Sequence, residues 1–86
     1  MQEFIDSLNL PILGEMRGKQ YIIPVNSSNE FSKVFTCISM NNKLNVEDDS
    51  EATVDQSEFR FTDGYYEVYL NADYDKDTYT ALIEEK

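Results

Sequence analysis

The dipeptide Asp63-Gly64 stands between two short runs in which apolar and polar residues alternate. Asp-Gly is a preferred two-residue hairpin turn, because glycine readily adopts the positive φ that such a turn requires. A turn at this dipeptide pairs residues 58–62 with residues 65–72 as an antiparallel hairpin. In that register one face of the hairpin is apolar and carries Phe59, Phe61, Tyr66, Val68 and Leu70. This agreement between turn and pattern predicts a fold that contains an antiparallel sheet.

The second face of the predicted hairpin is aromatic and acidic. Arg60 lies opposite Glu67 in this register, so an ion pair is expected there. The other residues of this face are Tyr65, Tyr69, Asn71 and Asp73. Tyrosine offers a rigid, amphipathic surface that is common at the centres of protein interfaces. We therefore regard Tyr65 and Tyr69, together with Tyr74, as candidates for contact with a partner.

The two ends of the chain predict further elements. Residues 2–8 carry apolar side chains at helical spacing, and Pro11 prevents the helix from continuing. Asp77 is a suitable N-cap for a C-terminal helix over residues 77–86, although the threonines and tyrosine that follow it also suit a strand.

Residues 19–25 are rich in strand-forming residues and predict a strand. Pro24 cannot donate a backbone hydrogen bond, so this strand lies at a sheet edge or has Pro24 near its end.

Residues 26–40 fit two interpretations. Ser27 and Glu30 have the spacing of a capping box, which favours a helix. Residues 34–38 are strongly strand-prone, and a turn over residues 41–43 would pair them with the segment that follows. We expect the strand, and the helix stays open as the alternative.

The predicted fold is therefore α+β, with one compact acidic domain over residues 1–86. It has a small antiparallel sheet of three or four strands, including the 58–62/65–72 hairpin, a short N-terminal helix and a C-terminal helix. We expect a mobile acidic loop over about residues 47–57.

The net charge of −10 is concentrated in one half of the chain. Residues 1–45 hold four acids and four bases, so thirteen of the seventeen acids and three of the seven bases follow residue 45. Solubility of a small domain needs a net charge of only about 2–8, and self-repulsion opposes a compact fold. The excess of acid indicates a use beyond solubility.

Composition excludes several classes of function. A protein of this charge is repelled by phosphate, so we expect no direct binding to nucleic acid. The chain has no histidine and only one cysteine, Cys37, so the usual catalytic bases, activated thiols and disulfides are missing. We expect no enzyme and no cofactor. The lone cysteine suggests a reducing cytoplasm, and we expect neither a signal peptide nor a membrane span.

The C-terminal acids allow one weak alternative, a calcium site. Asp73, Asp75, Asp77 and Glu84 occupy positions 1, 3, 5 and 12 of an EF-hand-like loop. Thr78 stands where that loop has glycine, and the chain has no room for an exiting helix. We therefore expect no metal.

In size, charge and lack of catalytic groups, the chain resembles small phage-encoded nucleic-acid mimics, a class that includes anti-CRISPR proteins, anti-restriction proteins and uracil-DNA glycosylase inhibitors. It also resembles the immunity proteins that neutralise nuclease toxins. The resemblance implies an inhibitor, first of all an anti-CRISPR-like one, in the cytoplasm of a host bacterium, with a basic DNA- or RNA-binding protein as its partner. The predicted partner-binding residues are acids and tyrosines of the second half: Glu47, Asp48, Asp49, Glu51, Tyr65, Glu67, Tyr69, Asp73, Tyr74, Asp75 and Asp77.

The alternative from another class is a non-catalytic interaction module or phage structural component whose charge is incidental. Such a module would use an apolar patch, and residues 11–13 and 21–23 supply candidates. Contacts through such a patch would also allow a homodimer.

Overall fold

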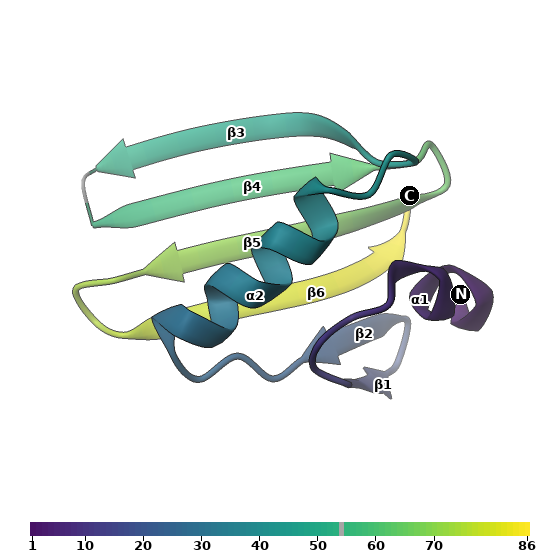
Figure 1. Cartoon of the computed structure of the whole chain (residues 1–86), viewed down its shortest axis with the longest axis horizontal. Helices are drawn as coiled ribbons and strands as arrows, with labels where there is room; N and C mark the ends of the chain where they lie inside the picture. Colours follow the sequence, from purple (N-terminus) through teal and green to yellow (C-terminus); the bar gives the residue numbers. More distant parts are fainter. Residues whose placement is uncertain (54) are drawn as a thin grey trace.

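The computed structural model describes the backbone of residues 1–53 and 55–86. It describes the side chains of residues 1–47 and 55–86. Six strands form one antiparallel sheet, and two helices accompany it (Figure 1). The elements in chain order are α1 (Gln2–Leu8), β1 (Glu15–Arg17), β2 (Gln20–Ile23), α2 (Ser28–Ser39), β3 (Asn45–Thr53), β4 (Gln56–Thr62), β5 (Tyr66–Asp73) and β6 (Thr78–Glu85).

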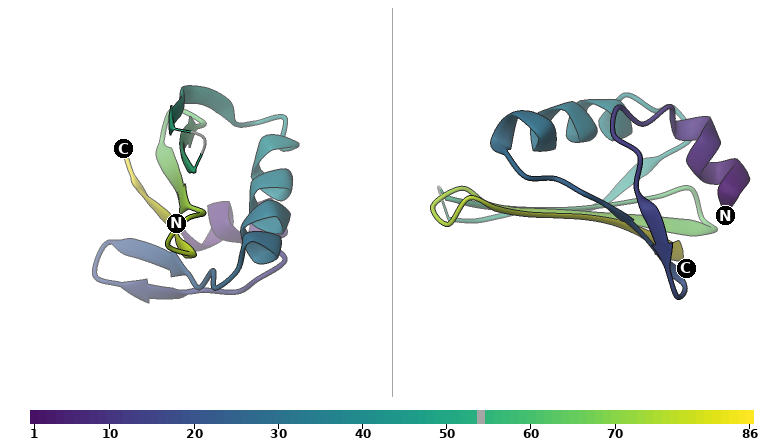
Figure 2. Two further views of the ribbon diagram at one scale, coloured as in Figure 1. Left: turned by 90° about the vertical axis from the view of Figure 1, so that its left-hand side faces the viewer. Right: turned by 90° about the horizontal axis from the view of Figure 1, so that it is seen from below.

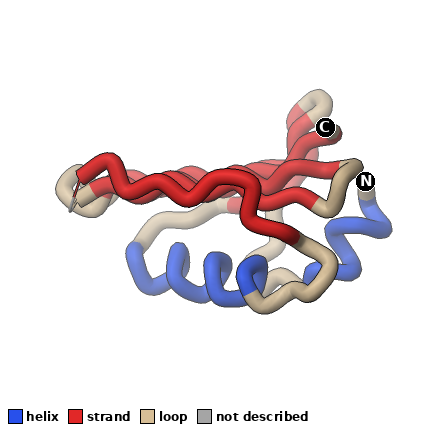
Figure 3. The backbone as a smooth tube through the Cα atoms, turned by 90° about the horizontal axis from the view of Figure 1, so that it is seen from above, coloured by secondary structure: helices blue, strands red, loops and turns tan. Residues whose placement is uncertain are grey.

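The sheet order is β1-β2-β6-β5-β4-β3, so the four strands of the acidic half lie side by side as a meander. The neutral half supplies β1, β2 and both helices. Both helices lie on one side of the sheet (Figures 2 and 3). The opposite side, here called the open face, has no helix over it in the part of the chain that the structure describes. The acidic half of the chain thus forms most of the sheet, and the helices of the neutral half cover one face of it.

The core lies between α2 and the sheet. Val34 and Ile38 of α2 are fully buried, and so are Val68 and Leu70 of β5 and Ile83 of β6. Aromatic rings extend this core towards its margins in two tight pairs, Phe4 with Tyr66 and Phe35 with Phe59, each with ring centroids 4.6 Å apart. The apolar face predicted for the hairpin is therefore confirmed as a core face.

The strand expected over residues 34–38 is wrong, because this segment belongs to α2. The hydroxyl of Ser27 accepts a hydrogen bond from the backbone N–H of Glu30 at 3.1 Å. The carboxylate of Glu30 accepts one from the backbone N–H of Asn26 at 2.9 Å. The capping box therefore starts a helix, and the helix buries an apolar stripe against the sheet, which outweighs the strand propensity of its second half.

The β4–β5 hairpin is confirmed, but its register differs from the predicted one by two residues. Thr62 pairs with Glu67 rather than with Tyr65. The Asp63 carboxylate accepts hydrogen bonds from the backbone N–H groups of Tyr65 and Tyr66 at 2.8 and 2.9 Å, which widens the loop to four residues. A shift of two residues preserves both faces, because side chains alternate with a period of two.

Two other expectations are corrected. The C-terminal helix is instead strand β6, which pairs along its whole length with β5. Most of the segment 47–57, expected as a loop, lies in β3 and β4, and Val54 lies outside the described residues. The sheet therefore has six strands rather than three or four.

The predictions for the N-terminal region agree with the structure. Helix α1 spans Gln2–Leu8 and ends at Asn9, whose φ of 53° is left-handed. Strand β2 ends at Ile23, directly before Pro24, and it lies between β1 and β6 rather than at the edge. Among the described residues, no helix is long and apolar enough to cross a bilayer.

Candidate partner-binding face

The open face is organised as rows that run across the strands. Residues opposite one another in an antiparallel sheet share a face, and successive rows along a strand are about 6.7 Å apart. One row, here called the apolar row, is formed by Ile22, Leu82, Tyr69 and Arg60, from β2, β6, β5 and β4. The neighbouring row, at the end of the sheet where β6 finishes, is here called the acidic row. It is formed by Gln20, Glu84, Glu67 and Thr62.

The apolar row places hydrophobic surface on the side of the sheet that no helix covers. Ile22, Leu82 and Tyr69 are neighbours on adjacent strands, and each is half-buried. Arg60 continues the row on β4. Its Nε atom is buried and finds no hydrogen-bond partner in the described structure, and its nearest acidic partner is Glu47 Oε2 at 3.5 Å.

The acidic row sets two carboxylates directly opposite each other. Glu67 of β5 faces Glu84 of β6, and like charges in this position destabilise a sheet. Gln20 Nε2 donates to Glu84 Oε2 at 2.9 Å, and the Tyr69 hydroxyl donates to Glu67. These neutral donors hold the carboxylates in place without neutralising their charge.

The electrostatics of this face follow from these contacts. The hydrogen bond to Glu67, partial burial and the nearby Glu84 raise the pKa of Tyr69 to about 12. The hydrogen bond from Lys86 lowers the pKa of Glu47, and Arg60 acts in the same direction. Lys86 Nζ lies 3.0 Å from Glu47 Oε1. The protonated phenol of Tyr69 and the ionised carboxylate of Glu47 are therefore the stable forms over the whole neutral range.

The structure divides the predicted site residues among three places. The open face carries Glu47, Glu67, Tyr69 and Asp73. Tyr65 lies in the β4–β5 turn and is 77% exposed. The β5–β6 turn holds Tyr74, Asp75 and Asp77. Strand β5 separates the two turns by roughly 23 Å, so the two turns lie at opposite ends of β5.

The side chains of Asp48, Asp49 and Glu51 lie outside the described residues, although their backbone belongs to β3.

Two residues of the β5–β6 turn are held by local contacts. The ring of Tyr74 packs edge-on against Phe31, and Asp77 accepts a hydrogen bond from the Tyr79 hydroxyl at 2.8 Å. Because β5 ends at Asp73 and the chain then turns, Asp75 and Asp77 do not continue the extended strand that carries Glu67.

The calcium alternative does not assemble. Asp73 pairs with Thr78, whereas Glu84 lies six residues farther along β6, roughly 20 Å away. The Asp73 carboxylate already accepts from the backbone N–H of Lys76 at 3.2 Å. Among the described residues, no group of three His, Cys, Asp or Glu side chains could hold a metal ion.

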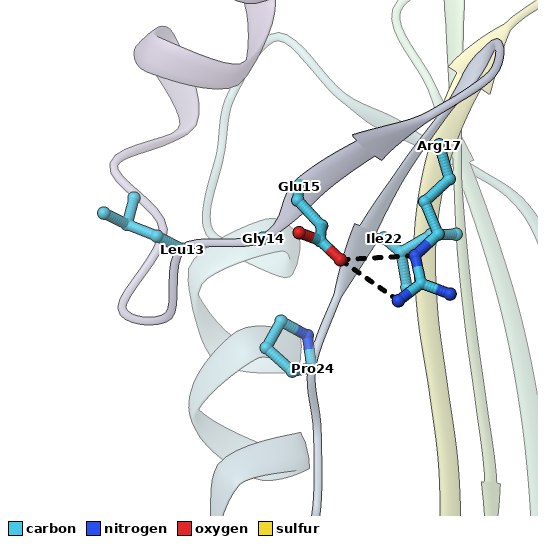
Figure 4. Close-up of a pocket in the computed structure, with 6 residues that line it drawn as sticks. All are labelled: Leu13, Gly14, Glu15, Arg17, Ile22 and Pro24. Atoms are coloured by element: carbon cyan, nitrogen blue, oxygen red, sulfur yellow. Dashed lines mark hydrogen bonds and ion pairs between the residues drawn. The ribbon is translucent and has the colours of Figure 1, made fainter.

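A shallow hollow of about 240 Å³ borders the open face at the β1–β2 end. Leu13 and Pro24 flank it, and the ion pair between Glu15 and Arg17, 3.1 Å long, lies over Ile22 (Figure 4). The hollow extends the apolar row beyond β2.

Sequence reasoning missed Leu82 as a surface residue. It named Ile22 only within the apolar segment 21–23 of the interaction-module alternative, and it assigned Glu84 only to the calcium alternative. The register of β6 against β5 and β2 brings these residues beside Glu67 and Tyr69. A strand interpretation of residues 78–85 would have placed Leu82 and Glu84 on one face.

Comparisons of this chain with family models, with curated proteins and with solved structures give no match.

Proposed function

We propose that this protein is an acidic inhibitor that occupies the basic nucleic-acid-binding site of another protein. The observation that carries the proposal is the pairing of an apolar row with an acidic row on the open face. Protein interfaces combine an apolar centre with a polar rim, and carboxylates that replace phosphates fit a groove lined with lysine and arginine. The half-buried Ile22, Leu82 and Tyr69 supply the centre, and Glu67 and Glu84 supply charge beside it.

Within this class, the proposal extends to a phage anti-defence protein that acts in the cytoplasm of a host bacterium without catalysis. An anti-CRISPR-like inhibitor is our first choice. Anti-restriction, glycosylase-inhibitor and nuclease-immunity types use the same chemistry on other targets. Two features support this proposal: the chain resembles small phage-encoded nucleic-acid mimics in size and charge, and its open face carries the apolar and acidic rows.

The test is capture of partners from a bacterial lysate on the immobilised protein at low salt. We expect a basic nucleic-acid-binding protein that elutes when salt is raised, because salt screens exposed charges. We also expect double-stranded DNA or RNA to compete with the immobilised protein for this partner. Retention that is insensitive to both salt and nucleic acid would contradict the proposal.

Variants locate the surface. The double substitution Glu67→Gln with Glu84→Gln keeps the side-chain shapes and removes two charges, and we expect binding at least about tenfold weaker. The matched control, Glu3→Gln with Asp6→Asn, removes two charges from α1 on the helix-covered side and should bind as the wild type does. Equal weakening by both pairs would show that total charge matters and the open face does not.

The acidic row offers a second readout. Because Glu67 and Glu84 face each other, Glu84→Gln should stabilise the fold by a few tenths of a kcal/mol while it weakens binding. A substitution that raises stability and weakens binding identifies a residue that serves binding at a cost to the stability of the fold.

The hollow beside Leu13 favours a second candidate, an interaction module whose charge is incidental. Leu13 is 81% exposed and lines this hollow together with Ile22 and Pro24. In this case Leu13→Ser would abolish capture, whereas the charge variants would leave it unchanged.

A further inference from the structure

Strand β1 is an edge strand with exposed residues throughout. It pairs with β2 alone in the described part of the chain, and Glu15, Met16 and Arg17 are all exposed. The β1–β2 hairpin projects from the body of the molecule (Figure 2). An edge strand presents backbone N–H and C=O groups that can pair with another strand.

The charges of β1 are complementary to those of a second β1 strand. In an antiparallel pairing centred on Met16, Glu15 of one copy lies opposite Arg17 of the other, and the reverse pair forms as well. Opposite charges placed directly across an antiparallel pair are stabilising. The single-strand contact between Glu15 and Arg17, 3.1 Å long, shows that both side chains reach along the same side of β1 (Figure 4).

The centre of this pairing is apolar. Met16 lies on the axis of the pair and is 48% exposed, and Leu13 stands just before the strand. Pairing would cover Met16 with its own copy, which removes apolar surface from water.

The opposite edge strand of the sheet, β3, belongs to the acidic half of the chain. Strand β3 runs through Glu47, and the sequence that follows adds further acids, Asp48, Asp49 and Glu51. Like charges directly across two strands disfavour pairing, and charged side chains on an edge strand are a common protection against it. Of the two edge strands, β1 is the one that belongs to the neutral half of the chain, so two copies of net charge −10 meet less repulsion there than at β3.

We propose that β1 is a self-association edge, on which a second copy of the chain pairs antiparallel with Met16 at the centre. This inference does not rest on the proposed inhibitor function, because its occupant and its test are different.

The test reverses the charge at position 15 or at position 17 and measures mass by sedimentation over a protein concentration series at low salt. The wild type should show a monomer–dimer equilibrium. Arg17→Glu leaves two acids on β1, and Glu15→Arg leaves two bases, so each variant alone faces like charges and should stay monomeric. An equimolar mixture of the two should dimerise, since every pair across the two strands is then opposite in charge.

Controls separate this effect from net charge and from unfolding. Lys33→Glu on α2 and Glu3→Arg on α1 make the same charge changes away from β1 and should leave the dimer intact. Thermal unfolding should be close to wild type for both β1 variants, because their ion pair is exposed and worth little. A wild-type monomer at every concentration, or a mixture no more dimeric than its components, would overturn the proposal.

Discussion

Gly14 lies directly against the backbone of β2. A Cβ atom at this position would lie 2.0 Å from the carbonyl oxygen of Ile22, far inside van der Waals contact. The Gly14 N–H donates to the hydroxyl of the buried Tyr21 at 2.7 Å. The close approach therefore satisfies a buried phenol and sets the path of the chain into β1.

Gly14→Ala should destabilise the fold by about 2 kcal/mol or more, because backbone atoms must move to admit the methyl group. The measurement is urea unfolding followed by circular dichroism. Gly18→Asn is the control, since Gly18 has a φ of +62° with open space around it and asparagine tolerates that conformation. Equal losses in the two variants would contradict the explanation by close contact.

Tyr69 makes stability depend on pH in the alkaline range. The unfolded chain releases this proton near the ordinary tyrosine pKa of about 10, whereas the Glu67 hydrogen bond, burial and Glu84 raise the pKa to about 12 in the fold. Between these values the folded state binds more protons, so the free energy of unfolding falls as pH rises.

Tyr69→Phe should therefore show a shallower loss of stability between about pH 10 and about pH 12 than the wild type. Glu67→Gln should lower the pKa of Tyr69, which ultraviolet absorbance of tyrosinate follows directly. An unchanged alkaline slope in Tyr69→Phe would show that the phenol is not held by this contact.

At the scale of single elements, α2 depends on its first turn. The Ser27 hydroxyl accepts the hydrogen bond from Glu30 that caps the helix. Ser27→Ala should cost about 1 kcal/mol, measured by urea unfolding. Ser32→Ala, on the exposed surface of the same helix, should be neutral, because serine has no capping role within a helix. A neutral Ser27→Ala would mean that packing alone fixes the start of α2.

The elements also show where sequence reasoning succeeds and where it fails. The β4–β5 hairpin could be predicted because its turn residue and its alternating pattern act locally. Its register could not, since the Asp63 carboxylate widens the loop by contacts that a two-residue turn does not make. In α2, strand propensity over residues 34–38 lost to burial of a helical stripe, which depends on the sheet beneath it.

The segment of β6 was wrongly predicted as a helix for a reason connected with the candidate site. Tyr79, Ala81 and Ile83 face the core in strict alternation, but Leu82 is apolar and faces the other way. That residue breaks the period of two and creates the appearance of a helical stripe. An apolar residue on the open face is what the proposed interface needs, so local inconsistency and candidate function coincide.

At the scale of the whole molecule, self-repulsion of the net charge of −10 weakens the fold. The molecule measures 34 × 23 × 22 Å, comparable with the Debye length of about 30 Å at 0.01 M salt. Raising sodium chloride to about 0.15 M shortens that length to about 8 Å. We expect the midpoint of thermal unfolding to rise with salt over this range.

A charge variant provides the control for this prediction. Glu58→Gln with Asp75→Asn reduces the negative charge of the meander and should show a smaller dependence on salt. A midpoint that falls with salt in the wild type would mean that favourable ion pairs outweigh repulsion.

The candidate face was predictable only in part at this scale. The concentration of acid after residue 45 is visible in the sequence, and so is the outward direction of Glu67 and Tyr69. The apolar row is not, because it joins Ile22 to Leu82 across a gap of sixty positions through the pairing of β2 with β6. Long-range strand order decides which distant residues become neighbours, and no local pattern encodes it.

The order of the sheet finally gives the molecule an electric polarity. All the net charge lies in the segment after residue 45, which forms the strands from β6 to β3, whereas the neutral segment before it forms β1 and β2 at the other edge (Figure 1). The centre of negative charge is thus displaced from the centre of mass, and the protein has a permanent dipole across its strands. In the field of a positively charged body this dipole experiences a torque. The molecule would rotate its charged side forward before contact, so that its approach is oriented while the two surfaces are still separated by water.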